Sequence, residues 1–175
     1  MAKVLFFLIT FLQGTALLAA TQKPPELGSL IESRQAYGKT KLSKFLWDIY
    51  DISLWTDAAV WSPNKPYAIT IHYLRPFTSK ELVDKTIEEM NRLGAPFNAE
   101  IYRKKLQELF PDVREGDRIT AYFNPASNVT FFFNGLKKGS VGNINFSKYF
   151  SDIWLSPQTE EPEARDALLK KNKWD

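Results

Sequence analysis

The Asn134-Gly135 pair places the strongest local constraint on how this chain folds. It separates two strand-like runs, "VTFFF" (129–133) and "LKKGSV" (136–141). Asn-Gly readily adopts the left-handed backbone that a two-residue hairpin turn requires, so two antiparallel strands are predicted here. A third run, "RITAYFN" (118–124), comes just before them across the short turn "PASN". We therefore expect an antiparallel meander of three strands in this part of the chain.

Two more extended segments are predicted in the first half of the chain. "YAITIHYL" (67–74) carries an apolar or aromatic residue at every second position, which is typical of a strand with one buried face. "SKFLWDIYDISLW" (43–55) has apolar residues on both faces, with Tyr50 on the same face as Ile52 and Leu54. This pattern predicts one continuous strand covered on both sides.

Helix signals lie between and after these strands. Thr78 and Glu81 have the spacing of a capping box at the start of a helix that Gly94 can end. Further helices are expected over 99–110, 146–155 and 158–169, with Asn98 and Asn145 as caps of the first two. The aromatic residues of 146–155 have helical spacing and are expected to pack in the core rather than to form a ligand cage. Strands, two helices, a meander and more helices indicate an α+β fold, with an antiparallel sheet backed by helices.

The two ends of the chain differ from its middle. Residues 1–20 have an early lysine, an apolar run and small residues at the end, which is the layout of a secretory signal peptide cleaved near Ala20. An uncleaved membrane anchor is the alternative. We expect a loosely held leader over 21–35, a single domain over 36–170 and a basic tail over 171–175. The expected location is periplasmic or secreted, and the protein would contact a membrane only through the signal segment before cleavage.

Composition argues against several kinds of site. The chain has no cysteine and a single histidine, His72, so a zinc or multi-histidine metal site is not expected. His72 is either a catalytic base or a structural residue. Lysine and arginine alternate with acidic residues around a net charge of only +3, which argues against a nucleic-acid partner. Gly139 and Gly142 either offer backbone N–H groups to an anion or serve turns. No cofactor is expected.

Five segments, in this order, resemble the chalcone isomerase-like family, in particular its exported bacterial branch. They are "YGKTKLSKFLWDIYDISLW", "ITIHYLRPFTSKEL", "LFPDVREGDRITAYF", "FFFNGLKKGSVGNINFSKYFSDIWLSP" and "EARDALL". The resemblance implies an open-faced β-sandwich, in which a large antiparallel sheet is backed by a layer of helices. It also implies a cleft between the sheet and the helices.

The resemblance further suggests where a site would lie. Plant chalcone isomerases position their substrate with an Arg, a Thr on the following strand, and Tyr, Lys and Asn on the first long helix. The corresponding residues here are Lys39 or Lys41, then Tyr50, then Leu82, Lys85 and Glu89. Replacing Arg by Lys loses the planar fork that grips an oxyanion, so plant-type catalysis is not implied. The candidate cleft residues are Lys41, Tyr50, Lys85 and Glu89.

Three functions follow as hypotheses. The favoured one is non-catalytic binding of a small apolar or amphipathic, fatty-acid-like molecule, its carboxylate near Lys41 or Lys85. The second is an isomerase acting on an unknown substrate, with Tyr50 and Lys85 as an acid/base pair. The third is a structural or partner-binding protein of the cell envelope. In each case with a site, we place it where the helix over 146–155 faces Tyr50 and the helix carrying Lys85.

Overall fold

The computed structural model describes residues 22–126 and 128–170, so the predicted signal peptide (1–20) and basic tail (171–175) lie outside the described residues. One six-stranded sheet dominates the fold, with its strands in the order in which they occur along the chain and every neighbouring pair antiparallel. The strands are β1 (Gly38–Lys44), β2 (Trp47–Thr56), β3 (Tyr67–Tyr73), β4 (Arg118–Asn124), β5 (Asn128–Phe133) and β6 (Leu136–Val141).

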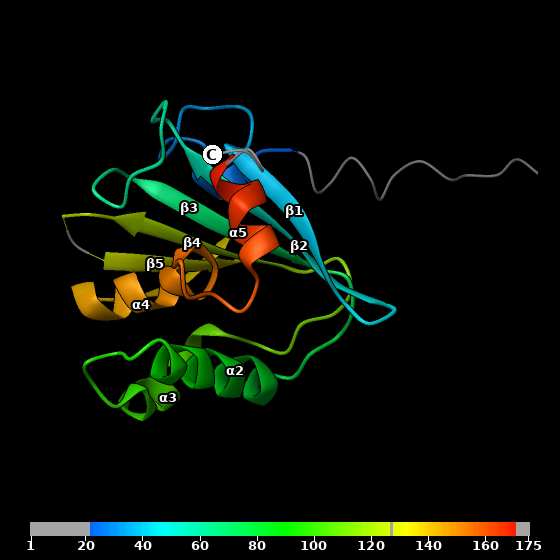
Figure 1. Ribbon diagram of the computed structural model, residues 1–175, viewed down its shortest axis with the longest axis vertical. Coiled ribbons are helices and arrows are strands. Elements are labelled where there is room, and N and C mark those ends of the chain that lie inside the picture. Colours follow the sequence, from blue (N-terminus) through cyan, green and yellow to red (C-terminus); the bar gives the residue numbers. More distant parts are fainter. Residues whose placement is uncertain (1–21, 127, 171–175) are drawn as a thin grey trace, which may run out of the picture.

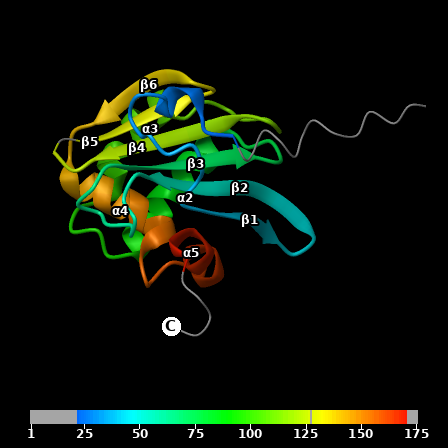
Figure 2. The same ribbon diagram turned by 90° about the horizontal axis from the view of Figure 1, so that it is seen from above.

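Helices cover one face of this sheet, as Figures 1 and 2 show. They are α2 (Ser79–Arg92), α3 (Arg103–Leu109), α4 (Ile144–Leu155) and α5 (Pro162–Leu169), together with the short 3₁₀ turn η2 (Ala99–Tyr102). A second 3₁₀ turn, η1 (Pro25–Leu27), lies on the opposite face. The predicted α+β class, a large antiparallel sheet backed by helices, is confirmed. In the part of the chain that the structure describes, no helix is long and apolar enough to cross a membrane.

The main core lies between the sheet and the helices. Alternate residues of the strands face the helices, as the period of a strand requires; on β3 these are Tyr67, Ile69, Ile71 and Tyr73, all buried. Phe146 and Phe150 of α4 are buried against them, and the Phe131 and Phe150 rings meet edge to face at 5.1 Å. The aromatic residues of α4 therefore belong to the core, as predicted from their spacing.

The local signals at α2 and at the β5–β6 turn are confirmed. Thr78 accepts a hydrogen bond from the Glu81 backbone N–H, and the Glu81 carboxylate accepts one from the Thr78 backbone, which completes the capping box. Asn134 and Gly135 have φ values of 47° and 87°, as a tight hairpin turn requires.

The predicted cap of α4 is wrong by two residues. Asn143, not Asn145, is the N-cap, and its side-chain oxygen accepts a hydrogen bond of 3.0 Å from the Phe146 N–H. Asn143 has the extended backbone of a cap, with φ −139°. Asn145 lies inside the first turn, where it cannot perform this role.

The single strand predicted over 43–55 is also wrong. The chain reverses at Phe45 and Leu46, so that Lys44 at the end of β1 pairs with Trp47 at the start of β2. Phe45 adopts a left-handed backbone with φ 56°. Neither turn residue belongs to the Gly, Asn, Asp and Pro set that announces hairpins, so the sequence carries no signal for this turn. Phe45 and Leu46 are therefore turn residues in solvent. The expected cover on both sides holds for the later part of β2, where Leu54 is buried in the main core and Trp55 is buried on the opposite face.

The expectation of a loosely held leader is wrong for residues 22–35. Leu27 and Ile31 are completely buried against Trp55 and Ala68, on the sheet face opposite the helices. Beside them, Glu26 accepts hydrogen bonds from Arg118 Nε (3.1 Å), Arg118 Nη2 (3.0 Å) and Thr120 Oγ1 (2.6 Å). The segment therefore covers part of the outer face of the sheet.

Candidate ligand cleft

A cavity of about 380 Å³ lies between the sheet and the helices α2 and α4. Its floor comes from helix-facing strand residues, namely Leu42, Tyr50, Ile71, Tyr73 and Ile119. Its walls are apolar residues of the covering segments, namely Phe77, Leu82, Phe110, Phe150, Ile153 and Trp154. A volume in the range of about 300–1,000 Å³ with mostly apolar walls is typical of small-molecule sites.

Charged side chains line the same cavity and gather at its mouth. They are the carboxylates of Glu81, Glu89, Glu160 and Glu161 and the ammonium groups of Lys44 and Lys85. Four carboxylates therefore face two ammonium groups, and the Arg92 guanidinium beside Glu89 and Glu160 adds a third cation. The local potential at the mouth favours a positive or neutral group over an additional anion.

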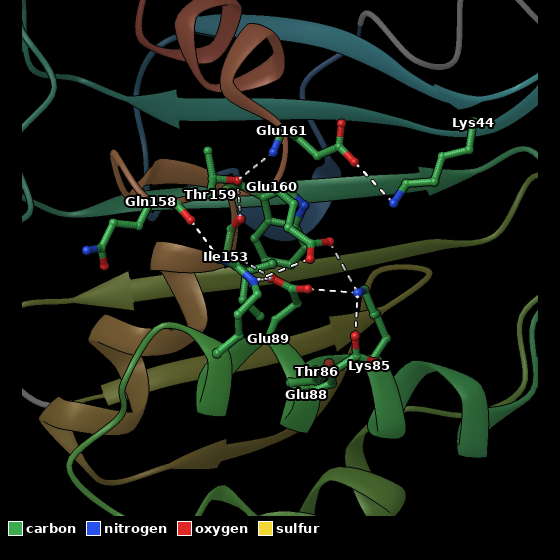
Figure 3. A network of polar contacts seen from close by, with 12 residues as sticks. Lys44, Lys85, Thr86, Glu88, Glu89, Ile153, Gln158, Thr159, Glu160 and Glu161 are labelled. Carbon is green, nitrogen blue, oxygen red and sulfur yellow. Dashed lines mark hydrogen bonds and ion pairs between the residues drawn. The ribbon is translucent and has the colours of Figure 1, made fainter.

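Lys85 is the centre of this charged network, which Figure 3 shows from close by. Its ammonium lies 2.7 Å from Glu89 Oε1, 3.0 Å from Glu88 Oε1 and 3.3 Å from Glu160 Oε2. On the other side of the mouth, Lys44 lies 3.3 Å from Glu161. Neither lysine of the cleft is therefore free of a carboxylate partner.

Glu89 is the buried member of the network, with a side chain only 4% exposed. Arg92, one turn further along α2, donates to its Oε2 at 2.6 Å, while Lys85 lies beside Oε1 without a hydrogen bond of good geometry. Burial alone raises the pKa of a carboxyl group. Here the hydrogen bonds from Arg92 and the nearby charge of Lys85 outweigh burial and lower the pKa of Glu89, so the group is charged at neutral pH.

Tyr50 presents its hydroxyl between the sheet and α4. Its oxygen accepts a hydrogen bond of 2.9 Å from the Trp154 indole N–H, and its ring packs edge to face on Tyr73 at 6.3 Å. Burial raises the pKa of Tyr50 to about 12, against the opposing effect of the hydrogen bond from Trp154. The phenol is therefore protonated at neutral pH.

The charges around Tyr50 and Lys85 decide whether these two residues could act as the acid/base pair of an isomerase. Burial tends to lower the pKa of Lys85, but its contacts with Glu89 and Glu88 outweigh burial and raise it. A general base works best when its pKa lies near the operating pH. The pKa values of Lys85 and Tyr50 both move away from that range. Neither residue is therefore supported as a proton acceptor.

The structure brings three of the four candidate residues together. Tyr50, Lys85 and Glu89 line the cavity, as does Leu82. Lys41 does not: it pairs across the strands with Asp51, on the face opposite Leu42 and Tyr50, and forms an ion pair of 2.7 Å with Asp48. A ligand role for any of these residues stays a prediction.

Sequence reasoning missed Lys44, Trp154, Glu160 and Glu161, which all line the cavity. Lys44 lies two residues after Leu42 on β1, so the two side chains share a face and both line the cleft, whereas Lys41 is on the opposite face. The two glutamates come from the connection between α4 and α5, which only the tertiary structure brings to the mouth.

The remaining candidates from the sequence lie elsewhere. His72 alternates with Ile71 and Tyr73 on β3, so it is on the outer face of the sheet, away from the cavity. Gly139 is a strand residue of β6, and a Cβ there would lie 2.9 Å from Leu109. Within residues 22–126 and 128–170 no group of three acidic or histidine side chains is placed to hold a metal ion.

Comparison with known proteins shows which family this chain belongs to. The sequence profile described as "Chalcone isomerase-like" matches residues 38–170. The chain belongs to the chalcone isomerase-like family. Its membership in the exported bacterial branch stays a prediction.

Among solved structures, the crystal structure of the Arabidopsis thaliana fatty-acid binding protein AtFAP1 is similar. The two share 12% sequence identity with a TM-score of 0.60, over 79% of this chain and 87% of that one. At this identity the likeness establishes the chalcone isomerase-like fold, and the predicted open-faced arrangement is confirmed. A search of curated protein sequences finds no match.

Proposed function

We propose that this protein binds a small apolar or amphipathic molecule in the cleft between sheet and helices, and that it does so without catalysis. The observation that carries the proposal is the cavity of about 380 Å³, whose floor and walls are mainly apolar and whose lining also includes charged groups. An apolar chain gains free energy by leaving water for such walls, while a polar end stays at the mouth. The structural likeness to AtFAP1, a fatty-acid binding protein, fits this role.

The charges at the mouth support a specific polar end for the ligand. A fatty-acid carboxylate would have to share Lys85 with Glu88, Glu89 and Glu160. Like charges at this distance repel, and a carboxylate that leaves water needs its own cation. We therefore propose that an alcohol or an amine at the end of the apolar chain binds more tightly than the carboxylate.

We also propose that the protein is exported after removal of a signal peptide. The support is the layout of residues 1–20. The anchored segment on the outer face begins only a few residues later, since Glu26 and Leu27 are already part of the fold. Cleavage near residue 20 would leave those contacts in place. The mass of the protein recovered from the exported fraction tests this.

Titration calorimetry with oleyl alcohol, oleylamine and oleic acid tests the binding proposal. We expect the alcohol and the amine to bind, and the acid to bind more weakly near neutral pH. Leu82→Trp should block the alcohol, since Leu82 is a half-buried wall residue of the cavity. Ile101→Trp is the matched control, because Ile101 is exposed and lies outside the cavity lining. Equal binding to both variants, or tightest binding of the acid, would contradict the proposal.

A further inference from the structure

The turn between β1 and β2 holds three consecutive large apolar side chains in solvent. Phe45 is 102% exposed, Leu46 96% and Trp47 66%. Single exposed apolar residues are common and need no explanation. Three in a row at the end of a hairpin form an apolar tip, and such a tip points to something that covers it. We call Phe45, Leu46 and Trp47 the hairpin tip.

The fold holds the hairpin tip away from the rest of the molecule. Figures 1 and 2 show the β1–β2 hairpin extending beyond the ends of the strands beside it. Phe45 takes a left-handed backbone that glycine or asparagine would adopt with less strain. Just behind the turn, Asp48 accepts from both Lys41 and Ser43 at 2.7 Å, which ties the two strands together. The apolar side chains are therefore presented by a braced turn.

Basic side chains surround the hairpin tip. The Arg75 guanidinium lies 5.8 Å from the centre of the Trp47 ring. Within the residues that the structure describes, no carboxylate lies within ion-pair distance of Arg75. Lys44 directly precedes the tip, and its partner Glu161 is 3.3 Å away. The acidic neighbour Asp48 is already paired with Lys41. The charge left without a partner beside the tip is therefore positive.

An apolar tip with a tryptophan and adjacent cations matches the layers of a lipid bilayer. Phe and Leu fit the acyl region, Trp favours the interface, and Arg and Lys fit the phosphate layer of anionic lipids. A bilayer needs no shape complementarity. A stable protein partner instead buries about 800 Å² on each side, far more than three side chains at a turn offer.

The same hairpin forms part of the cleft. Leu42 and Lys44 of β1 and Ile49 of β2 all line the cavity, and they lie within five residues of the tip. We propose that the hairpin tip docks on the surface of a bilayer that contains anionic phospholipid, which brings the cleft beside the membrane. The docking stands on its own observations. That a ligand would then pass between the membrane and the cleft rests on the proposed function.

A single fluorophore on the tip tests the docking. The chain has no cysteine, so Leu46→Cys labelled with the dye NBD reports on the tip alone. With vesicles of phosphatidylglycerol and phosphatidylcholine, we expect its emission to rise and shift to the blue. Ile101→Cys, also exposed, is the matched control and should not respond. A silent label at 46, or an equal response at 101, would overturn the proposal. The control also detects attachment through residues 1–20, since that would move neither label into lipid.

Two variants separate the apolar and electrostatic parts. Replacing Phe45, Leu46 and Trp47 by Ser should weaken partition onto these vesicles by about tenfold or more, because three large apolar groups lose their transfer into lipid. Arg75→Gln should reduce the preference for phosphatidylglycerol over pure phosphatidylcholine. Retained partition of the triple variant, or no preference for anionic vesicles in the unmodified protein, would contradict the proposal.

Failure of docking is distinguishable from failure of the proposed function. None of Phe45, Leu46, Trp47 and Arg75 lines the cavity. Binding of oleyl alcohol in solution therefore tests the cleft, and the label at residue 46 tests the tip. Capture of one defined protein through the tip, with no response to vesicles, would replace the bilayer by a protein partner and refute the proposal.

Discussion

Replacing Glu26 by Ala should destabilise the fold although Glu26 lies far from the cleft. Its side chain is 1% exposed, and its carboxylate accepts three hydrogen bonds, two from Arg118 and one from Thr120. Removing one partner of a buried ion pair costs about 3–5 kcal/mol, because the other charge stays buried without a partner. Arg118 is 23% exposed and can regain some water. We therefore expect a loss of about 2–3 kcal/mol in the free energy of unfolding.

Urea unfolding followed by tryptophan fluorescence measures this loss. With an m value of about 2 kcal/mol/M, the midpoint should fall by about 1–1.5 M. Glu32→Ala is the matched control, because Glu32 lies on the same segment, is exposed, and uses only its backbone N–H, which donates to Asp57. Its free energy of unfolding should stay within about 0.5 kcal/mol of that of the unmodified protein. Equal midpoints for the two variants would refute the anchoring of residues 22–35 on the sheet.

The effect of Glu26→Ala should also depend on pH. Burial tends to raise the pKa of Glu26, but its hydrogen bonds with Arg118 and Thr120 lower it below its ordinary value of 4.5. The contribution of a carboxylate with a lowered pKa is fully present above the unfolded value and is lost as the pH falls through the folded value. The two proteins should therefore converge in stability well below pH 4.5.

Three further predictions concern the cleft and the edge of the sheet. Glu89→Gln should lower stability near neutral pH. Because the pKa of Glu89 is lowered in the fold, the difference from the unmodified protein should shrink as the pH falls below the ordinary carboxyl value of 4.5. A difference in urea midpoint that stays constant from neutral to acid pH would contradict this. Tyr50→Phe should cost about 1–3 kcal/mol, because the Trp154 N–H loses its acceptor, and a double-mutant cycle with Trp154→Phe should show a coupling that is absent if the bond contributes nothing. Gly38→Ala should lower the melting temperature, because a Cβ there would lie 2.0 Å from the Leu168 carbonyl oxygen and would force α5 away from β1. An unchanged melting curve would show that α5 does not pack on β1 at this position.

The elements with complete local signals could be predicted from the sequence. The capping box at Thr78 and the Asn-Gly turn each specify a local geometry through two neighbouring residues, and both occur where expected. The period of two in β3 was enough to separate its buried from its outer face. The order of these elements then led to the α+β class and, with the five matching segments, to the family.

What could not be predicted depends on long-range contacts or on turns without signal residues. Phe45 and Leu46 form a hairpin turn that their residue types disfavour, so the sequence predicts one strand where the structure has two, β1 and β2. The anchoring of Glu26 depends on Arg118, which lies 92 residues further along the chain. Glu160 lines the cavity only because the connection between α4 and α5 lies beside Lys85 of α2, 75 residues away in the chain.

The central claim is that the cleft holds an apolar or amphipathic molecule, and native mass spectrometry tests it most directly. The full-length sequence should be expressed, and the protein recovered from the exported fraction should be weighed under native and denaturing conditions. The account predicts one small molecule per chain that is lost on denaturation, absent from Leu82→Trp and present in Ile101→Trp. A bare native mass for the unmodified protein, together with no uptake of added oleyl alcohol or oleylamine, would contradict it.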